Sequence, residues 1–342
     1  MNAPAPSVPA LSVRGLTVRY GRAGKTPPAV DDVSFDVAPG ETLGLVGESG
    51  SGKSTIGKAI LGLQPPTAGQ VLLHGADITR ASLRRRRVAA IDLRVVFQDP
   101  YSSLNPDQTI GQTLVEPLRV LRVPKDERWR RVTESLTAVG LPADAAGRYP
   151  ARFSGGQRQR IAIARALVCD PQVIVLDEPV SALDLSTQAQ VLNLLADLRD
   201  QRGLALLFIA HDLGVVRFLA QRVVVLYRGQ VMEAGGVDEV TRHPRHPYSI
   251  ALTAASPVPQ PAEQARRRFA REALGIGTAG ATPPSAAGCP FATRCPLVTD
   301  ICRTERVLLT PAGDSASASG GARGTAVACH HADEAAALRL PA

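Results

Sequence analysis

Long apolar runs are absent from this sequence of 342 residues, in which no stretch of roughly 18 or more residues is apolar throughout. A transmembrane helix needs such a run, so we expect no segment that spans a membrane. Residues 1–10 lack the charged start and apolar core of a secretory signal, and we therefore expect a cytoplasmic protein. Cysteine is scarce as well: of five cysteines, four lie after residue 288.

The overall composition is that of a soluble globular protein, with 44% hydrophobic and 20% charged residues. A chain of this length buries a sizeable core, and we expect one large or two moderate domains. The net charge of +8 is compatible with nucleic acid, an anionic membrane surface or a solvated basic face. We expect the run Arg84–Arg87 to be solvated, with contact to a partner or to lipid headgroups as the alternative.

A glycine-rich turn carries the strongest motif in the sequence. Gly47, Gly52, Lys53 and Ser54 fit the pattern G-x-x-x-x-G-K-[ST], between an apolar, strand-like run and a helical pattern. Glycines let the backbone curl so that its N–H groups point at phosphate oxygens, and the helix start adds its positive dipole end. Lys53 can reach the β- and γ-phosphates, and the Ser54 hydroxyl can bind Mg²⁺. The motif predicts a nucleotide site made of Gly47, Glu48, Ser49, Gly50, Ser51, Gly52, Lys53, Ser54 and Thr55.

Alternating and continuous apolar segments predict the strands of an α/β fold. We expect strands at residues 11–20, 33–37, 43–46, 71–73, 93–97, 173–176, 204–210, 223–226 and 230–234, the last two forming a terminal hairpin. Helical patterns at 110–121 and 127–139 occupy a stretch without strands, which indicates an inserted helical subdomain at about 101–160. Strands that alternate with helices at this spacing predict a mainly parallel sheet, preceded by antiparallel N-terminal strands.

A second glycine-containing loop follows Phe153 and opens a helix. Ser154 stands where an N-cap residue would, and the residues from Ser154 through Gly155 and Gly156 to Gln157 form a second candidate anion site at a helix start. Ser-Gly-Gly alone is weak evidence, because linkers contain it too. Its position between two predicted helices favours an anion-binding loop over a linker.

Two carboxylates follow the apolar run 173–176, at the end of a strand where parallel sheets bind ligands. Asp177 is suited to holding Mg²⁺, directly or through water, and Glu178 to polarising an attacking water as a general base. The alternative is a surface turn. His211 ends another buried strand and can donate a hydrogen bond to a γ-phosphate oxygen. Tyr20 ends the first strand, where it either rims the core or stacks on a purine base.

Together, these motifs resemble the ATP-binding cassette of ABC transporters over residues 11–250, which implies a P-loop NTPase fold. Phe153 stands where many members carry leucine and keeps that position apolar. The matching segments are Walker A at Gly47–Thr55, the Q-loop at Gln98, the signature loop at Ser154–Gln157, Walker B at Val173–Asp177, the catalytic glutamate at Glu178, the D-loop at Ser181–Asp184, the switch histidine at His211 and the adenine-stacking aromatic at Tyr20.

The resemblance implies a mechanism in which two cassettes pair head to tail, each ATP lying between the Walker A loop of one and the signature loop of the other. Glu178 would activate water opposite Lys53 and His211. The implied Mg²⁺ ligands are Ser54, Gln98 and Asp177, and the implied nucleotide contacts include Ser154, Gly155, Gly156, Gln157 and Asp184.

The implied partners are two transmembrane permease subunits, a second ATPase subunit that is identical or related, and, indirectly, an extracytoplasmic solute-binding protein. The helical subdomain and Gln98 would pass the motion of hydrolysis to the permease. This places the chain at the cytoplasmic face of the inner membrane as a peripheral subunit. No nucleic acid partner is expected.

The C-terminal part, residues 251–342, is similar to that of ATPases of bacterial oligopeptide and dipeptide importers. The similarity extends back to His246-Pro247-Tyr248 and includes Cys289-Pro290, Cys295-Pro296 and Cys302. Oligopeptides, dipeptides and nickel-type solutes all remain possible cargoes. Residues 259–288, which contain the basic patch Arg266–Arg268, indicate a linker.

Four cysteines gather near the C-terminus: Cys289, Cys295, Cys302 and Cys329. In a cytosolic chain such a group indicates metal or iron–sulfur ligation rather than disulfides. Four thiolates suit a [4Fe–4S] cluster or tetrahedral Zn²⁺, and the resemblance to the importer ATPases favours the cluster. Zinc, with His330 or His331 as a substitute ligand, and unligated thiols are the alternatives. We expect Cys169 to be a small buried hydrophobe.

Two other classes of function compete with a transporter ATPase. A cassette ATPase that acts on nucleic acid or the ribosome is disfavoured, because the chain has one cassette rather than a tandem pair and no long coiled-coil arm. A nucleotide-gated scaffold without hydrolysis is disfavoured because Glu178 and His211 are both present.

Overall fold

The computed structural model describes residues 8–21, 27–99, 103–256, 265, 287–312 and 324–338. The expected basic patch Arg266–Arg268 and nearly all of the expected linker at 259–288 lie outside these ranges. No helix among the described residues is both long enough and apolar enough to cross a bilayer.

The main sheet has the strand order β11-β12-β10-β9-β3-β8-β7-β6. From β9 to β6 its strands are parallel, and those from β11 to β9 pair antiparallel, which confirms the expected mainly parallel sheet and the hairpin. Every residue of β3 and β8 is buried, as is typical of a sheet covered on both faces. The strands are β3 (Thr42–Val46), β6 (Leu93–Val96), β7 (Val173–Asp177), β8 (Ala205–Ala210), β9 (Arg222–Tyr227), β10 (Gln230–Gly236), β11 (Thr310–Pro311) and β12 (Ala326–Val327).

A second, antiparallel sheet lies beside it, with the order β2-β1-β4-β5. Its strands are β1 (Leu11–Val18), β2 (Val30–Val37), β4 (Ala68–Leu73) and β5 (Ala76–Asp77). Helix α1 (Lys53–Ile60) packs between the two sheets, where Ile56 and Ile60 share a core with Leu11 of β1 and Val175 of β7. Because α1 is packed against both sheets, the position of the loop that precedes it, at the edge of the main sheet, is fixed by this packing.

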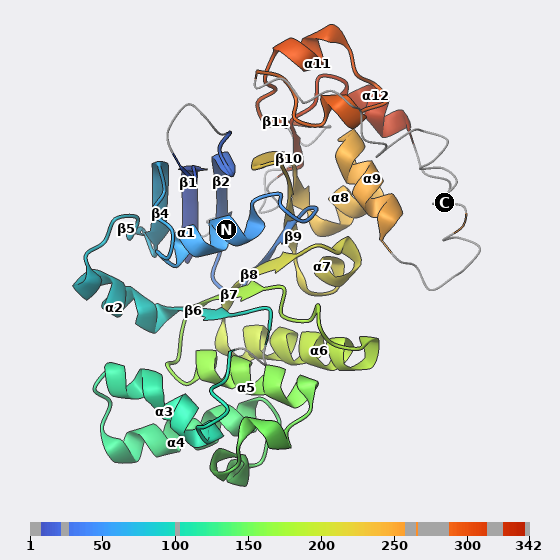
Figure 1. Cartoon of the computed structure of the whole chain (residues 1–342). Coiled ribbons are helices and arrows are strands. Elements are labelled where there is room, and N and C mark those ends of the chain that lie inside the picture. Colours follow the sequence, from blue (N-terminus) through green and yellow to red (C-terminus); the bar gives the residue numbers. More distant parts are fainter. Residues whose placement is uncertain are drawn as a thin grey trace, which may run out of the picture.

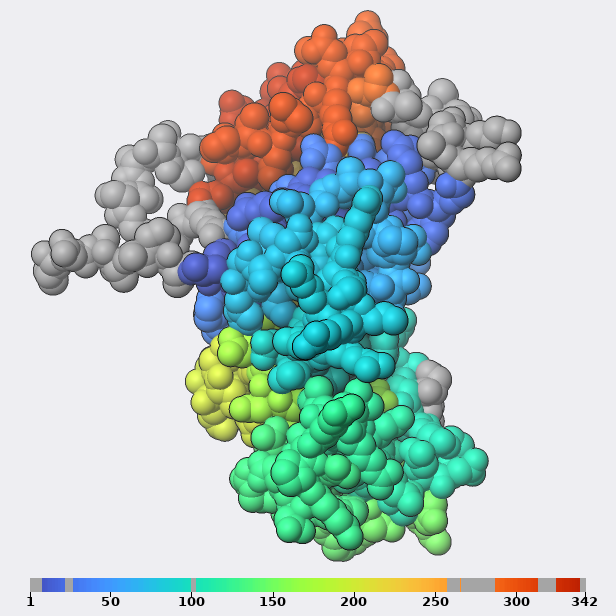
Figure 2. All heavy atoms as spheres, turned by 90° about the vertical axis from the view of Figure 1, so that its left-hand side faces the viewer, coloured from blue at the N-terminus to red at the C-terminus, as the bar shows by residue number. Residues whose placement is uncertain are grey.

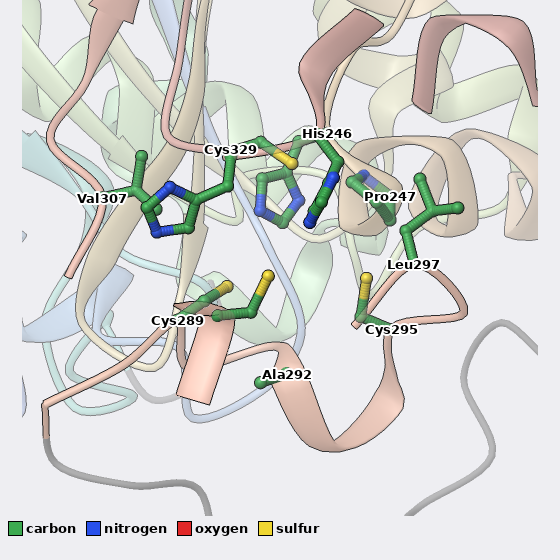
Figure 3. A pocket seen from close by; sticks show the side chains of 11 residues that line it. His246, Pro247, Cys289, Ala292, Cys295, Leu297, Val307 and Cys329 are labelled. Carbon is green, nitrogen blue, oxygen red and sulfur yellow. The ribbon is translucent and has the colours of Figure 1, made fainter. Parts of the chain in front are cut away.

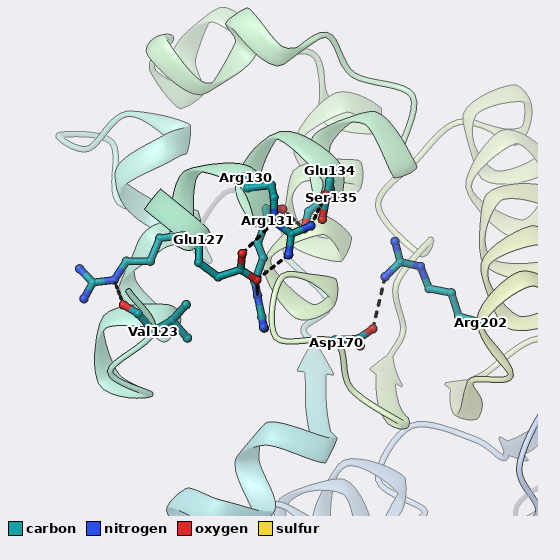
Figure 4. A network of polar contacts seen from close by, with 9 residues as sticks. Val123, Glu127, Arg130, Arg131, Glu134, Ser135, Asp170 and Arg202 are labelled. Carbon is teal, nitrogen blue, oxygen red and sulfur yellow. Dashed lines mark hydrogen bonds and ion pairs between the residues drawn. The ribbon is translucent and has the colours of Figure 1, made fainter. Parts of the chain in front are cut away.

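Helices form a separate lobe at the opposite end of the molecule from the C-terminal elements (Figure 1). This lobe contains α3 (Ile110–Val120), α4 (Lys125–Ala138) and α5 (Gly155–Leu167), close to the helical patterns expected for the inserted subdomain. On the surface of α4, Glu127 accepts hydrogen bonds from Arg130 and Arg131, which lower the pKa of Glu127 to about 2 (Figure 4). Such exposed ion pairs contribute little to stability.

The basic run belongs to helix α2 (Leu83–Asp92), which precedes β6. Arg84, Arg85 and Arg87 are exposed, as expected. Arg86 was expected to be solvated with them, and this was wrong. It points inward and donates to the carbonyl oxygens of Ile60 and Thr79, both at 3.0 Å. A helix turns about 100° per residue, so one member of a run of four faces the core.

The C-terminal elements pack at the β10 edge of the main sheet. They comprise α11 (Asp300–Thr304), α12 (Ala332–Ala337), β11 and β12. The helices that precede them in the chain are α6 (Leu185–Arg202), α7 (Leu213–Leu219), α8 (Val237–Arg242) and α9 (Pro247–Ala255). β12 pairs with β10 through Glu233 opposite Val327 and Ala234 opposite Ala326, so the predicted hairpin does not end the sheet. Figure 2 shows this red and orange part on one end, the blue core in the middle and the green helical lobe at the other end.

Candidate nucleotide-binding site

The loop between β3 and α1 has a conformation that only glycine adopts without strain at three of its positions, Gly47, Gly50 and Gly52. Gly50 has φ +77° and Gly52 has φ +104°, and a Cβ atom at Gly52 would lie 2.4 Å from the carbonyl oxygen of Ala29. Gly52 is also the N-cap residue of α1. Ser49 and Gly50 are exposed at the tip of the loop. The glycine-rich turn therefore lies open to solvent directly before a helix start, which is the geometry expected of a phosphate site.

Lys53 lies across the base of this loop. Its side chain is buried, and its ammonium donates to the carbonyl oxygens of Gly47 at 2.8 Å and Glu48 at 3.0 Å. Burial lowers the pKa of Lys53, whereas the nearby carboxylates, first that of Glu178, act to raise it. A desolvated ammonium inside the loop is suited to pairing with phosphate oxygens, which are stronger acceptors than the carbonyls it now contacts.

Ser54 and Asp177 come from α1 and from the end of β7, and the fold brings them together. The Ser54 hydroxyl donates to Oδ1 of Asp177 at 3.3 Å. Burial, followed by the neighbouring Glu178, raises the pKa of Asp177. A hydroxyl and a carboxylate at this spacing offer the oxygen ligands that Mg²⁺ prefers, and a cation there would relieve the unfavourable burial of the carboxylate.

Glu178 lies between Gln98 and His211, so side chains that follow β6, β7 and β8 meet at one edge of the sheet. Gln98 Nε2 donates to Oε2 of Glu178 at 2.9 Å, and the same oxygen lies 3.5 Å from Nδ1 of His211. The Glu178 backbone has φ +48°, an uncommon conformation for a residue with a side chain, and its N–H donates to the Ile209 carbonyl at 3.0 Å. Strained residues of this kind cluster at functional sites. Glu178 is 19% exposed, as a base that must reach a water requires.

Tyr20 lies beside the first turn of α1. Tyr20 is 47% exposed, and its hydroxyl is 3.3 Å from Oγ1 of Thr55. This exposure is compatible both with the rim of the core and with stacking on a base. An exposed aromatic next to a phosphate loop is well placed to stack on a base.

The second glycine loop opens α5 as predicted, with Ser154 as its N-cap. The Ser154 hydroxyl accepts from the Gln157 N–H at 3.3 Å, and the Gln157 side chain accepts from the Ser154 N–H at 3.0 Å, which forms a capping box. Gly156 abuts α6, since a Cβ atom there would lie 2.3 Å from Thr187. Figure 1 places α5 in the helical lobe, apart from α1. One chain therefore does not bring its own two glycine loops together.

Asp184 has a different environment from the other nucleotide-site candidates. Its carboxylate caps α6, accepting from the Thr187 N–H at 3.0 Å and from the Ser186 hydroxyl at 2.6 Å. These hydrogen bonds lower the pKa of Asp184. The sequence signal was available, because aspartate ahead of a long helical pattern is typical of an N-cap.

The four C-terminal cysteines line one pocket, together with three histidines (Figure 3). All four are free thiols, and burial raises the pKa of Cys295 to about 12 and that of Cys329 to about 11. Within the described ranges, no three or more His, Cys, Asp or Glu side chains lie as a group that could hold a metal. The histidines are His246, His330 and His331. Cys169 is buried, as expected, and is not among the residues that line this pocket.

His246 and Arg294 are residues of this region whose positions the sequence did not indicate. The His246 ring is buried and lines the cysteine pocket, and its Nε2 has no hydrogen-bond partner among the described residues. Arg294 reaches out of the C-terminal part to Glu48 of the phosphate loop. No local pattern marks either contact.

Comparison with known proteins gives two family matches and close relatives. Residues 30–181 match the ABC transporter family, and residues 232–302 match the C-terminal region of oligopeptide/dipeptide transporters. A Brucella abortus protein named for peptide import and ATP binding is 50% identical over 86% of this chain and 92% of its own. The oligopeptide transport ATP-binding protein OppF of Salmonella typhimurium is 46% identical over 83% of this chain and 85% of its own.

Solved structures share the fold of the cassette. CbiO1 of Clostridium perfringens, part of the transporter complex cbiONQ, has a TM-score of 0.62 and 27% identity, over 68% of this chain and 90% of that one. The dimeric ATP-binding cassette MJ0796, in a post-hydrolysis state with ADP and Pi, has a TM-score of 0.59 and 30% identity, over 66% of this chain and 98% of that one.

Proposed function

Because this chain belongs to the ABC transporter family and ends in a region of the oligopeptide/dipeptide transporter type, we propose that it is the ATP-hydrolysing subunit of a peptide importer. The observation that carries the enzymatic part is the position of Glu178, held by Gln98 and His211 beside a phosphate loop. The relatives named for peptide and oligopeptide transport, which are similar over most of the chain, support the cargo class.

We assign the chemistry to residues as follows. Lys53 pairs with the β- and γ-phosphates, and Tyr20 stacks on the base. Mg²⁺, when bound by Ser54, Asp177 and Gln98, neutralises negative charge on the phosphates. Glu178 accepts a proton from the attacking water, and His211 donates a hydrogen bond to the γ-phosphate. The hydrogen bond from Gln98 and the contact with His211 orient the Glu178 carboxylate before the nucleotide arrives.

We propose that two such cassettes close over each nucleotide. The loop Ser154–Gln157 lies in the helical lobe, away from the phosphate loop of the same chain. It forms the N-terminal end of α5, and the N-terminus of a helix is suited to binding an anion. A second cassette, identical or related, would bring its own loop to the site, and the dimeric arrangement of MJ0796 supports such pairing. The carboxylate of Asp184 caps α6, so the D-loop would meet the nucleotide through other atoms.

We also propose a division of the chain into two parts, which the two separate family matches at residues 30–181 and 232–302 support in outline. We assign residues 1–250 to the ATP-binding domain, with a helical subdomain at about 101–160 that contacts the permease, and residues 251–342 to the importer-type C-terminal region. We place the subunit at the cytoplasmic face of the membrane, bound to two permease subunits. β12 of the C-terminal region pairs with β10 and so extends the sheet of the ATP-binding domain. This pairing supports the proposal that the two parts move together when the subunit acts on the permease.

Copurification tests this proposal. When the chain is coexpressed with the two permease subunits of a peptide importer from the same organism, we expect a stable complex whose ATP hydrolysis rises when a peptide-loaded solute-binding protein is added. Recovery with nucleic acid or ribosomes instead, and no effect of peptide, would contradict the proposed partner. A permease complex that responds to nickel chelates and not to peptides would contradict the proposed cargo.

We further propose that the cysteine pocket binds a metal through its thiolates. The convergence of four free thiols on one cavity supports this, because a metal lowers thiol pKa and would stabilise the deprotonated form. The cavity has a volume of about 10 Å³, roughly the space of one water molecule. In this structure the described thiols do not lie as a group that could hold a metal, so binding of either Zn²⁺ or a [4Fe–4S] cluster would require the cysteine side chains to move.

Elemental analysis of protein purified without oxygen tests the metal. We expect either about four iron and four sulfide per chain, with a brown colour, or about one zinc per chain. Cys295→Ser should lose most of the metal, and Cys169→Ser, which changes a thiol outside the pocket, should keep it. Metal-free wild-type protein with all its thiols open to titration would contradict the proposal.

A further inference from the structure

The C-terminal region contacts the phosphate loop through a paired hydrogen bond. Arg294 donates from Nη1 to Oε2 of Glu48 at 2.8 Å and from Nη2 to Oε1 at 3.0 Å. The Glu48 side chain is 44% exposed and that of Arg294 19%. A fork of two parallel bonds between guanidinium and carboxylate fixes direction as well as distance. Glu48 directly follows Gly47, so the fork holds the first half of the loop.

A second contact, from α9, holds the Glu48 backbone; α9, like Arg294, lies within residues 232–302, which match the C-terminal region of oligopeptide/dipeptide transporters. The Tyr248 hydroxyl accepts a hydrogen bond from the Glu48 N–H at 2.8 Å. Tyr248 is fully buried, and its ring packs on Tyr227 and Phe291, with centroid distances of 4.6 and 5.4 Å. The guanidinium of Arg294 lies over the Phe291 ring at 5.5 Å. The two residues that hold Glu48 therefore belong to one aromatic cluster and are themselves immobilised by packing.

The third contact of Glu48 is with the lysine assigned to the phosphates. The Glu48 carbonyl oxygen accepts from the Lys53 ammonium at 3.0 Å, and the Gly47 carbonyl accepts from it at 2.8 Å. Because an ammonium has three N–H donors, pairing of Lys53 with two phosphates would draw it away from at least one of these carbonyls. Arg294 and Tyr248 do not depend on Lys53, so they can hold Glu48 in place while Lys53 changes partners. A loop that keeps its shape binds an anion with less loss of conformational freedom.

Charge gives Arg294 a further role. Glu48 is a carboxylate within the phosphate loop, and unpaired it would repel a bound triphosphate. The guanidinium of Arg294 neutralises it at hydrogen-bond distance. Burial of Tyr248 raises its pKa, so its hydroxyl stays neutral beside the loop.

We propose that Arg294 and Tyr248 are positioning residues of the ATP site, through which the segment at residues 232–302, matched to the oligopeptide/dipeptide transporter C-terminal region, sets the affinity of the phosphate loop for nucleotide. The inference rests on the proposed binding of ATP by this loop. It gives the importer-type C-terminal region a part in the ATPase cycle of its own chain. Arg294 belongs to the 3₁₀ turn Ala292–Arg294 between Cys289 and Cys295, so the cysteine pocket and the phosphate loop share one structural support.

A double-mutant cycle on the full chain tests this. Binding of a fluorescent ATP analogue and steady-state hydrolysis are measured for Arg294→Ala, Glu48→Gln and the double variant. Arg294→Ala should weaken nucleotide affinity about five- to tenfold, because it leaves a half-exposed carboxylate unpaired in the loop. kcat should change less than about twofold, because Arg294 does not touch the reacting atoms. In the Glu48→Gln background, the same substitution should have little further effect.

Two further variants separate positioning from folding. Arg303→Ala is the matched control, since Arg303 pairs with Asp300 at 3.0 Å in the same region and is exposed. It should leave nucleotide affinity unchanged. Arg294→Lys keeps the charge over the rings without the fork, and it should recover part of the affinity. Tyr248→Phe, which removes one hydroxyl from the packed cluster, should weaken affinity in the same direction.

Two results would overturn the inference. One is an affinity of Arg294→Ala within twofold of Arg303→Ala in protein that melts at the wild-type temperature. The other is an effect of Arg294→Ala that persists in full when Glu48 is already glutamine. If the wild-type chain itself binds no ATP, both this inference and the proposed function fail, which distinguishes that case from failure of the positioning role alone.

Discussion

Glu178→Gln should lower the rate of ATP hydrolysis by about 100-fold or more while ATP remains bound, because general bases contribute roughly that much to such reactions. The glutamine keeps the size of the side chain and can still hydrogen-bond to Gln98, which now contacts Glu178 at 2.9 Å. It cannot accept a proton from water. The measurement is single-turnover hydrolysis of radiolabelled ATP together with the amount of nucleotide retained.

The control for this substitution is Glu134→Gln, which removes a carboxylate from an exposed ion pair on α4. That variant should hydrolyse ATP at the wild-type rate. Hydrolysis by Glu178→Gln at more than a tenth of the wild-type rate would contradict the assignment of Glu178 as the base. In that case, the left-handed backbone at Glu178 and its contacts with Gln98 and His211 would serve another purpose.

Lys53→Ala should abolish measurable ATP binding at micromolar concentrations, an affinity loss of roughly 100-fold, because a buried charge-assisted contact to phosphate is removed. The substitution also leaves the Gly47 and Glu48 carbonyls without the partner they now have at 2.8 and 3.0 Å. Calorimetric titration with MgATP measures the binding, and thermal unfolding without nucleotide shows whether the loop itself has become less stable.

Lys58→Ala is the matched control for Lys53→Ala. Lys58 is exposed in the last turn of the same helix, α1, so its removal changes the charge near the site without removing a phosphate ligand. It should bind MgATP within about twofold of the wild-type protein. Equal affinities for Lys53→Ala and Lys58→Ala would remove Lys53 from the phosphate site.

Much of the candidate site could be predicted because its residues stand in local patterns. The glycines around Lys53 are required by a backbone that other residues adopt only with strain, as Gly52 shows. Glu178 and His211 follow apolar runs, and parallel strands bring their carboxyl ends to one edge. Ser154 and Gln157 have the spacing of a capping box.

The contacts of the C-terminal region could not be predicted in this way. Arg294 and Glu48 are 246 residues apart, and a side-chain pair over such a distance leaves no periodic signal. β11 and β12 are strands of two residues each, too short for an alternating pattern. Arg86 points inward because of the way α2 is rotated about its axis. Four identical arginines in a row give no sign of which one faces the rest of the protein.

The nucleic-acid alternative finds no support in these results. The relatives and the two family matches point to transporters. The basic run on α2 remains exposed at three positions, and an anionic partner for it is not required by the transporter function.

The measurement that tests the central claim most directly is complementation between two inactive copies. One copy carries Lys53→Ala and the other Ser154→Arg, and each alone should hydrolyse almost no ATP. If the site is shared between chains, coexpressed copies should recover roughly a quarter of the wild-type rate, since half of randomly formed pairs are mixed and each mixed pair has one intact site. No recovery, in a preparation where differently tagged copies purify together, would contradict the shared site.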